Sequence, residues 1–461
     1  METWIGIDIG TTNCKVGVCN GQYELLKLYT MPTPRKQTDV GEVYDAVKLR
    51  QGLLTFVEQA VSAGGASLIS ISSMAEAGAL VDRRTGELVS DLIPWQDPAS
   101  AAFVTGEDRL EEQERFFRTG LHGAYKYSLY KVLAYKAHKG SVAHLQFLPA
   151  ASLAAWFLTG NMVTDITLAA RTYACDIFKE CYEKKLLERR GLPSDIFPEI
   201  TRGYAGKWKG IRVFVAGHDH VCAAVAAGIS RENGEIFLSL GTTGVMMGCI
   251  PLGSLTQGDY ESGYAFGRHP DRQQMTWMGA VQSAGASIDW ILEQTGTEEG
   301  YGVFGRSVCP EPVGILYYPY LNGSGPPQFC HEAGGAFLGL SRDTGGKDLI
   351  RAVLQGIAFE IRFMLEHRGG RYPQVLKATG GCTKNHTLMQ ILSNVTACEI
   401  AVLDCEQASL LGAVMTGNAV TCGNPGIRCR FLPEKKSGER YESLYGEYLK
   451  FRPVILDYRR T

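Results

Sequence analysis

Apolar and polar residues alternate along two short stretches that lie about half the chain apart. Residues 4–18 read WIGIDIGTTNCKVGV, in which two alternating runs flank a Gly-Thr-Thr turn, and residues 236–248 read IFLSLGTTGVMMG. This pattern predicts two strands joined by a tight loop in each stretch. The repeat indicates two similarly built halves, each opening with the same strand-turn-strand unit.

Elsewhere the apolar periodicity changes repeatedly between that of a helix and that of a strand. A long helical stretch is predicted over 106–160, ending at Gly160, because glycine is frequent just past a helix end. The other predicted elements are a helix at 45–63, strands at 68–73, 79–86 and 275–281, and helices near 283–295, 347–367, 384–397 and 440–450. Such alternation is typical of α/β proteins.

The polar segment ISRENG at residues 229–234 interrupts two apolar runs and marks the expected boundary between the halves. A chain of 461 residues exceeds the size of one typical domain. We therefore expect an N-terminal domain over residues 1–229 and a C-terminal domain over residues 230–461.

Composition excludes several classes of function. Hydrophobic residues make up 45% of the chain and charged residues 20%, and the formal net charge of -2 gives no field that would attract nucleic acid or an anionic membrane. The 13 cysteines include no C-x-x-C pair, which favours a reducing cytoplasm over a zinc or disulfide framework. We find neither a signal peptide pattern nor an apolar run of the ~20 residues that a membrane span needs. A small-molecule partner is expected.

The two Gly-Thr-Thr loops are candidate phosphate-binding elements. Their small residues let backbone N–H groups and threonine hydroxyls reach phosphate oxygens, and two such loops across a cleft would hold a polyphosphate from both sides. The first loop, taken alone, could instead be an ordinary hairpin turn beside a buried aspartate, Asp8. Neither G-x-x-x-x-G-K-[ST] nor a strand-G-x-G-x-x-G-helix unit occurs, which disfavours a P-loop or dinucleotide fold. The loop residues are Gly10, Thr11, Thr12 and Lys15 in the first stretch and Gly241, Thr242 and Thr243 in the second.

Asp219 is the candidate general base. Residues 211–228 read IRVFVAGHDHVCAAVAAG and predict a strand that leads into a helix, with Asp219 close to the helix N-terminus. A carboxylate there can accept a proton from a substrate hydroxyl, although capping the helix is the alternative role. His218 and His220 suggest a metal site, but they lack the further ligands of a closed zinc site.

A third element follows at residues 375–397, which read VLKATGGCTKNHTLMQILSNVTA. The pattern predicts a strand, a turn at Gly380 and Gly381, and an amphipathic helix. Glycines at this turn would let a nucleotide base lie against the backbone, within reach of Asn385 on the first helical turn.

In this order, the motifs resemble those of the FGGY carbohydrate kinases, which include glycerol, xylulose, fucose and rhamnulose kinases within the actin and heat-shock-chaperone ATPase superfamily. The resemblance covers nearly the whole chain. The matching segments are IGIDIGTTNCKVGV, LSLGTTG, TGGCTKN, AGHDH, PWQD at 94–97, LTG at 158–160 followed by Asp165 and Arg171, YPYLNG at 318–323 and EQASLLGA at 406–413.

This resemblance implies an α/β fold of two actin-like (ribonuclease H-like) domains, each a mixed sheet flanked by helices, with a cleft between them. It also implies transfer of the γ-phosphoryl group of ATP, with Mg²⁺, to a hydroxyl of a small sugar or polyol, and a possible homodimer.

Residue roles follow from the same resemblance. Asp219 is implied to be the base and, with Asp8, to position Mg²⁺. The loop residues given above are implied to surround the phosphates. Two further sets are implied, namely Gly285, Gly380, Gly381 and Asn385 for the nucleoside, and Glu76, Trp95, Asp97, Asp219 and His220 for the sugar. Trp95 could instead be a core residue and Glu76 a solvated turn residue.

The sequence departs from the family pattern at several positions, so the substrate stays open. Segment 98–100 (PAS) follows Asp97 where many members have arginine, Cys382 replaces a glycine, and His220 replaces a glutamine that is usual in glycerol and xylulose kinases. Ala75 stands where an arginine would bind glycerol, which disfavours that substrate. A ketopentose, ketohexose (xylulose-, ribulose- or fuculose-like) or related polyol is preferred.

Two other functions belong to different classes. One is an ATP-dependent conformational switch, as in actin and the chaperones, and the other is a catalytically silent sugar sensor. The polar set of AGHDH, Glu76 and WQD is not needed by a switch, and the retention of Asp8, Asp219 and both loops argues against a silent sensor.

Overall fold

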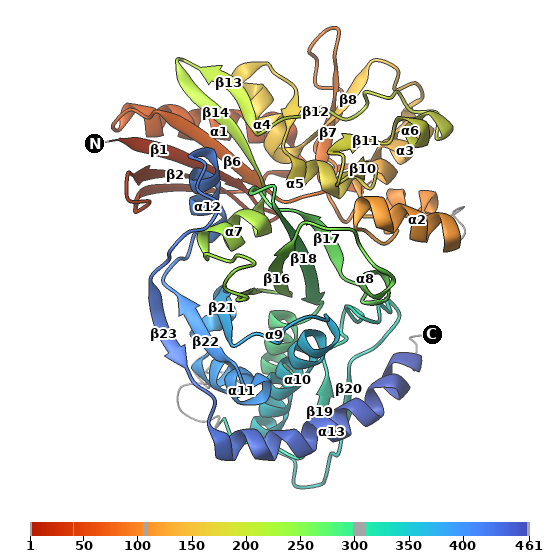
Figure 1. The fold of residues 1–461 in the computed structure, drawn as a ribbon, viewed down its shortest axis with the longest axis vertical. Coiled ribbons are helices and arrows are strands. Elements are labelled where there is room, and N and C mark those ends of the chain that lie inside the picture. The colour runs from red at the N-terminus through yellow and green to blue at the C-terminus, as the bar shows by residue number, and fades with distance from the viewer. Residues whose placement is uncertain (1, 40, 105–108, 298–309, 459–461) are drawn as a thin grey trace.

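The computed structural model describes residues 2–458 except 40, 105–108 and 298–309, and its framework is two mixed β-sheets, one in each half (Figure 1). The first has the order β13-β14-β6-β1-β2-β3 and the second β17-β18-β16-β15-β21-β22-β23. The strands of the first sheet are β1 (Thr3–Ile9), β2 (Asn13–Asn20), β3 (Leu25–Pro32), β6 (Leu68–Ser73), β13 (Tyr204–Trp208) and β14 (Ile211–His218). Those of the second are β15 (Ile236–Leu240), β16 (Gly244–Pro251), β17 (Ala265–Arg268), β18 (Gln274–Val281), β21 (Val375–Thr379), β22 (Glu399–Leu403) and β23 (Ile427–Phe431).

Both sheets share one pattern of strand directions. Read from β3 to β13, neighbouring strands pair antiparallel, antiparallel, parallel, parallel and antiparallel. Read from β18 to β23, the second sheet gives the same series, and β17 is an additional edge strand. The expectation of two similarly built halves is therefore confirmed, and each Gly-Thr-Thr loop occupies the same place in its sheet, at the tip of the antiparallel pair beside the parallel strands.

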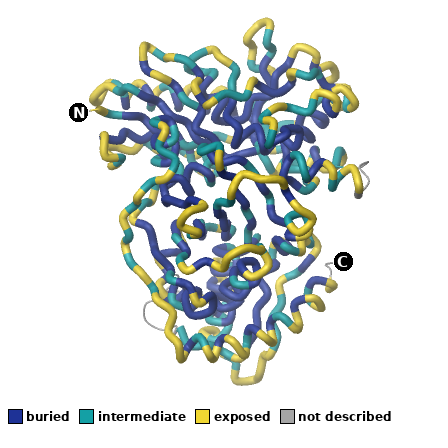
Figure 2. The backbone as a smooth tube through the Cα atoms, in the orientation of Figure 1, coloured by how far each residue is buried: buried dark blue, intermediate teal, exposed yellow. Residues whose placement is uncertain are grey.

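The central strands are buried because helices cover the sheets. Strand β6 reads LISISS and is buried at every position, as parallel strands with both faces covered usually are. The described helices longer than seven residues are α1 (Ala46–Ser62), α2 (Arg109–Thr119), α3 (Ser128–Lys139), α4 (Ala150–Thr159), α7 (Asp219–Ala226), α9 (Gly285–Gln294), α10 (Gly346–His367), α11 (His386–Thr396), α12 (Ala408–Gly417) and α13 (Lys435–Asp457). Figure 2 shows the sheets and the helices against them in the dark blue of buried residues.

Shorter elements connect this framework. They comprise α5 (Ile166–Ala169), α6 (Lys184–Arg189), α8 (Gln257–Glu261), β4 (Arg35–Thr38), β5 (Gly41–Tyr44), β7 (Gly78–Asp82), β8 (Leu145–Pro149), β9 (Val163–Thr164), β10 (Cys175–Asp176), β11 (Cys181–Tyr182), β12 (Glu199–Ile200), β19 (Leu316–Tyr318) and β20 (Ala336–Leu338). Across the described residues, none of the helices combines the length and apolar character needed to cross a bilayer.

Two helices join the halves. Helix α12 belongs to the second half of the sequence but packs against β6, β1 and β14 of the first sheet, while α7 packs against α12 and β16, so both lie between the sheets (Figure 1). Gly412 on α12 allows this approach, since a Cβ there would lie 1.7 Å from the carbonyl oxygen of Cys222. The hydroxyl of Ser70 donates to the carbonyl of Ala413 at 2.6 Å, which fixes α12 on the first sheet.

Two sequence-based predictions of elements need correction. The stretch 106–160 is not one helical region, because the run LQFLP forms strand β8 and pairs antiparallel with β7; its beginning, 105–108, lies outside the described residues. Tertiary pairing with β7 decided this, as five buried residues fit either a helix or a strand. The predicted C-terminus at Gly160 is confirmed by a left-handed φ of 75°.

The closing helix is longer than the predicted 440–450. Helix α13 continues past Pro453, whose ring removes one backbone hydrogen bond. Its last turns are held by Arg452, which is 2% exposed and paired with Glu360 on α10.

Candidate active site

Asp8 lies near the end of β1, beside the first Gly-Thr-Thr loop. Ser72 on the neighbouring β6 donates its hydroxyl to Asp8 Oδ1 at 3.0 Å, and Lys15 stands opposite Asp8 on β2. Burial, and then the charge of Asp219, raise the pKa of Asp8 to about 7. Two acidic groups from different elements are thus brought within electrostatic reach of each other.

Hydrogen bonds stabilise the first loop and connect it to neighbouring segments. The N–H of Gly10 donates to the carbonyl of Asn13 at 3.0 Å, and Arg35 donates to the carbonyl of Thr11 at 2.9 Å. Thr12 is exposed in the same turn. The ammonium of Lys15 donates to Gln407 Oε1 at 2.8 Å, so this residue ties the loop to the segment that precedes α12.

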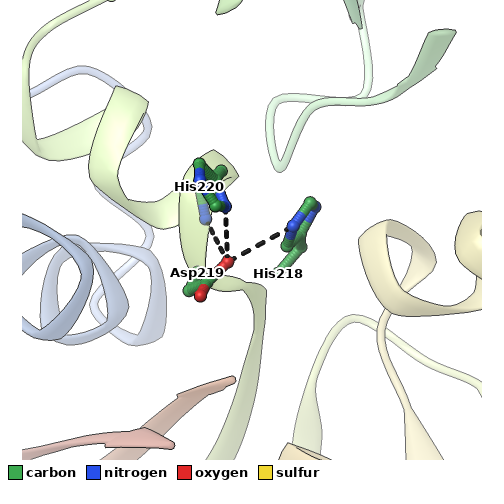
Figure 3. A group of neighbouring side chains, drawn as sticks. All are labelled: His218, Asp219 and His220. Atoms are coloured by element: carbon green, nitrogen blue, oxygen red, sulfur yellow. Dashed lines mark hydrogen bonds and ion pairs between the residues drawn. The ribbon is translucent and has the colours of Figure 1, made fainter. Parts of the chain in front are cut away.

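Asp219 is the first residue of α7 and is flanked by two imidazoles (Figure 3). His220 Nδ1 lies 2.8 Å and His218 Nε2 lies 3.3 Å from the same oxygen, Oδ1, and the backbone N–H of His220 donates to Oδ1 at 2.7 Å. Burial by itself would raise the pKa of Asp219, but the charge and hydrogen bonds of His220 and the nearby His218 hold it below its ordinary value. The carboxylate is therefore ionised at neutral pH, and neither imidazole contacts its second oxygen, Oδ2.

The two histidines differ in protonation. Burial lowers the pKa of His218 to about 4, so its ring is neutral at pH 7. Burial also opposes the charge of His220, but Asp219 outweighs it and raises the pKa of His220 above its ordinary value. These three residues have ligand atoms within 4.8 Å of one another, yet their strongest contacts are to each other. The arrangement is better explained as a carboxylate hydrogen-bonded by two imidazoles than as a zinc site.

The Glu76 side chain is only 9% exposed and pairs with Arg171, so its alternative as a solvated turn residue is wrong. Its backbone has a φ of 61°, which is uncommon for a residue with a Cβ and is typical of strain at a functional position. Arg171 donates from Nε and Nη2 to Glu76 Oε1 at 2.8 and 2.5 Å, and the Arg171 guanidinium lies 5.3 Å from the ring centroid of Tyr127. Although burial opposes ionisation, Arg171 holds the pKa of Glu76 below its ordinary value.

Trp95 and Asp97 lie on the segment that follows β7. Trp95 packs against the core of the first half and is partly exposed. It can therefore be a core residue and also contact a ligand. Asp97 caps the short 3₁₀ helix Pro98–Phe103 and accepts a hydrogen bond of 2.6 Å from Ser100. The fully buried Lys131 donates to the carbonyl of Trp95 at 3.4 Å, which orients the segment.

The second Gly-Thr-Thr loop lies against the start of α9 and the Gly-Gly turn. Gly285 donates to the carbonyl of Gly241 at 2.9 Å, and Ala286 donates to the carbonyl of Thr242 at 3.1 Å. A Cβ on Gly285 would lie 2.5 Å from the Gly241 oxygen, and one on Gly380 would lie 2.4 Å from the Leu240 oxygen. These glycines therefore allow three backbone segments to meet at the loop.

Two further residues complete the Gly-Gly turn. Asn385 caps α11 through Oδ1, which accepts from the N–H of Leu388 at 3.0 Å, while its buried Nδ2 has no hydrogen-bond partner in the described part of the chain. Gly381 leads into the turn with open space above its Cα, where a Cβ would meet nothing within 4 Å. Cys382 replaces the family glycine and places its thiol 3.7 Å from the Gly241 oxygen.

Gly285→Ala tests this packing. The added methyl should displace the second loop and raise the KM for ATP about tenfold to a hundredfold, because small misplacements of positioning groups are costly. Steady-state kinetics with varied ATP measures the effect. Gly258→Ala is the matched control, since a Cβ there meets its nearest neighbour at 3.7 Å. An unchanged KM in the Gly285 variant would show that the loop tolerates the displacement.

A small cavity lies between the halves. It is lined from the first half by Thr167, Ala170, Arg171, His218 and Val221, and from the second half by Met247, Ala265, Phe266, Gly267, Arg268, Thr276 and Met278. Arg171 and His218 connect this cavity to Glu76 and Asp219. Two of the predicted sugar residues, Glu76 and Asp219, thus contact side chains that line a space between the halves.

Several residues of the site were not predicted from the sequence. Thr167 accepts the backbone N–H of His218 at 2.9 Å and is itself held by Asp165, whose Oδ2 accepts from the Thr167 N–H at 2.7 Å. Ser72 and Lys131 were also missed. No periodicity or motif marks them, because their importance lies in contacts with distant segments.

Comparison with known proteins places the chain in one family. Residues 3–226 match the N-terminal domain, and residues 236–420 the C-terminal domain, of the FGGY family of carbohydrate kinases. A xylulose kinase of Lactococcus lactis subsp. lactis is 26% identical over 488 residues, covering 96% of this chain and 95% of that protein. A glycerol kinase of Alkalilimnicola ehrlichii is also 26% identical, covering 96% and 95%.

Solved structures agree with this placement in fold. A ligand-bound xylulose kinase from Lactobacillus acidophilus has a TM-score of 0.89 at 20% identity, covering 100% of this chain and 99% of its own. A Plasmodium falciparum glycerol kinase with ADP has a TM-score of 0.84 at 18% identity, covering 98% of each chain. The actin-like two-domain fold is confirmed. The chain belongs to the FGGY family of carbohydrate kinases and is an ATP-dependent kinase of a sugar or polyol.

Proposed function

We propose that this kinase phosphorylates a hydroxyl of a ketopentose, ketohexose or related polyol, with Asp219 as the general base. The observation that carries the proposal is the state of Asp219, a partly buried carboxylate whose pKa His220 holds low, with one oxygen unoccupied by either imidazole. A base with these properties can accept a proton from a hydroxyl that lies within hydrogen-bond reach of its second oxygen.

The reaction follows from this geometry. The acceptor O–H lies against Asp219 Oδ2 and loses its proton to it as the oxygen bonds to the γ-phosphorus, while the bond from that phosphorus to the leaving oxygen of ADP breaks. The charge of His220 stabilises the carboxylate before transfer and makes it a weak base. Proton removal is then late, as expected for a loose transition state in phosphoryl transfer.

Asp8 and Asp219 fit Mg²⁺. Their two carboxylates are partly buried and repel each other, and the pKa of Asp8 is raised to about 7. A divalent cation bound between them would offset this repulsion. Bound there with ATP, Mg²⁺ would neutralise phosphate charge. We propose Asp8 and Asp219 as the residues that hold it, directly or through water.

Metal binding should therefore depend on pH in a defined direction. Because the pKa of Asp8 is about 7, Mg²⁺ must displace a proton below that pH, so affinity should rise as pH increases through about 7. Calorimetric titration in two buffers of different ionisation enthalpy counts the released proton. The variant Asp8→Asn should release none, and an affinity that is constant between about pH 6 and pH 8 would contradict the assignment.

We assign the nucleotide to both halves. In the domain 1–229, the phosphates would be contacted by Gly10, Thr11, Thr12 and Lys15. A second set of residues, in the domain 230–461, would lie opposite them. That second set comprises Gly241, Thr242 and Thr243 for phosphates and Gly285, Gly380, Gly381 and Asn385 for the nucleoside. The unpartnered Nδ2 of Asn385 supports this, since a buried amide without a partner is costly until a ligand supplies an acceptor.

The sugar is assigned to Glu76, Trp95, Asp97, Asp219 and His220. The names of the relatives do not decide the substrate, since one is a xylulose kinase and another, at the same identity, a glycerol kinase. Ala75, buried beside Glu76, cannot supply a cationic clamp for glycerol, which supports a larger acceptor.

A coupled ADP-release assay tests the proposal. Purified protein is given ATP, Mg²⁺ and a panel of pentuloses, hexuloses and polyols, with a no-sugar blank. ADP release that requires one class of sugar supports the kinase and identifies that class. Release independent of sugar would favour an ATP-driven switch, and binding of sugar without release would favour a sensor.

A further inference from the structure

Lys126 is a cation beside the proposed sugar site. It precedes α3 and is half-buried, and its charge acts on those of Glu76 and Arg171. Its ammonium has neither a hydrogen bond nor an ion pair with any residue that the structure describes. The nearest recorded contact is with the ring of Tyr127, whose centroid lies 5.5 Å away.

The other cations of this region are already satisfied. Arg171 is bound to Glu76 through two nitrogens, as described above. Lys131 donates to the carbonyls of Trp95 and Lys126 and is attracted to Asp97. Three cations, Lys126, Arg171 and Lys131, thus face two carboxylates, Glu76 and Asp97.

This excess of positive charge is costly in the free protein. Burial, and then repulsion from Arg171, lower the pKa of Lys126 to about 8, while Glu76 compensates only in part. Helix α3 adds to the positive potential, since its N-terminus has no side-chain cap. A ligand that brings one negative charge to Lys126 would be favoured here over a neutral one.

We propose that the acceptor carries a carboxylate that pairs with Lys126, so that the substrate is a polyhydroxy acid of five or six carbons. This rests on the proposed phosphoryl transfer with Asp219 as base, but it puts an acid in the sugar site in place of a neutral ketose or polyol and leaves transfer to one of its hydroxyls. A carboxylate fits better than a phosphate, because a phosphate dianion usually recruits several donors and Arg171 is committed to Glu76.

The test compares acids with neutral sugars of the same carbon number. Five- and six-carbon aldonates and ketoaldonates are assayed beside the matching ketoses and alditols, with one sugar monophosphate as a further arm. We expect the acids to have the higher kcat/KM. Lys126→Met should lower the ratio of acid to neutral kcat/KM about ten- to a hundredfold, and Lys126→Arg should restore most of it.

The pH profile separates charge recognition from a structural role. For the acid, kcat/KM should fall above about pH 8 as Lys126 loses its charge, and Lys126→Met should lack this limb. The pKa of Lys131 is also lowered to about 8, mainly by burial. Lys131 is still present in the Lys126→Met variant, where its ammonium donates to two carbonyls. A limb that persists in the methionine variant would therefore contradict the assignment.

Other outcomes also decide the question. A preference for neutral ketoses, an equal loss on both classes in Lys126→Met, or a preference for the monophosphate would overturn the proposal. If no acceptor gives Asp219-dependent ADP release, the proposed function fails instead. Calorimetric binding of the same acids without ATP then tests whether Lys126 binds the carboxylate. Thermal melting of both Lys126 variants verifies that they fold.

Discussion

Asp219→Asn should reduce kcat by about 10²- to 10⁴-fold while the enzyme still binds ATP and sugar. The amide keeps the size of the side chain and can still contact His220 and His218, but it cannot accept a proton from the acceptor hydroxyl. Stopped-time ADP assays at saturating substrates measure kcat, and calorimetry measures binding. Retained binding with lost turnover would assign the base rather than a structural role.

The control for this variant is Asp195→Asn. Asp195 forms a surface ion pair with Arg83, is 57% exposed and lies outside the proposed site, so its kinetics should stay those of the unchanged protein. Near-normal turnover in Asp219→Asn would refute the assignment. Loss of binding together with turnover would instead show that Asp219 maintains the site.

Arg452→Met should lower the free energy of unfolding by about 3–5 kcal/mol, the usual effect of removing one partner of a buried ion pair. Arg452 Nη2 lies 3.0 Å from Glu360 Oε1, and the side chains are 2% and 1% exposed. Glu360 Oε2 also accepts from the hydroxyls of Tyr320 at 2.9 Å and Tyr448 at 2.5 Å. The variant leaves Glu360 charged in the core of the second half.

Urea and thermal unfolding measure this loss, with circular dichroism and with binding of ADP as two probes. Arg428→Met is the matched control, because its ion pair with Asp404 is exposed and should contribute about 0–1 kcal/mol. The double variant Arg452→Met with Glu360→Leu should recover much of the loss, since no unpaired charge stays buried. If the single variant unfolded like the control, the pair would carry no stability.

The candidate site was predictable where its chemistry is local. The Gly-Thr-Thr loops join antiparallel strands, and Asp219 begins a helix, as the patterns around them indicate. Glu76 was singled out, but its burial and its contact with Arg171 were not. Those two residues lie 95 positions apart and no periodicity links them, so only the fold could bring them together.

The sequence by itself determined the alternation of strands and helices, the duplication of the hairpin and the family motifs, because these depend on neighbouring residues and short periods. Tertiary structure decided that LQFLP is a strand, that α12 crosses to the first sheet, and that α13 extends past Pro453. It also decided the charges at the site, with His218 neutral and Asp219 ionised. Pairing, burial and electrostatic fields arise between residues far apart in the chain, and no local pattern encodes them.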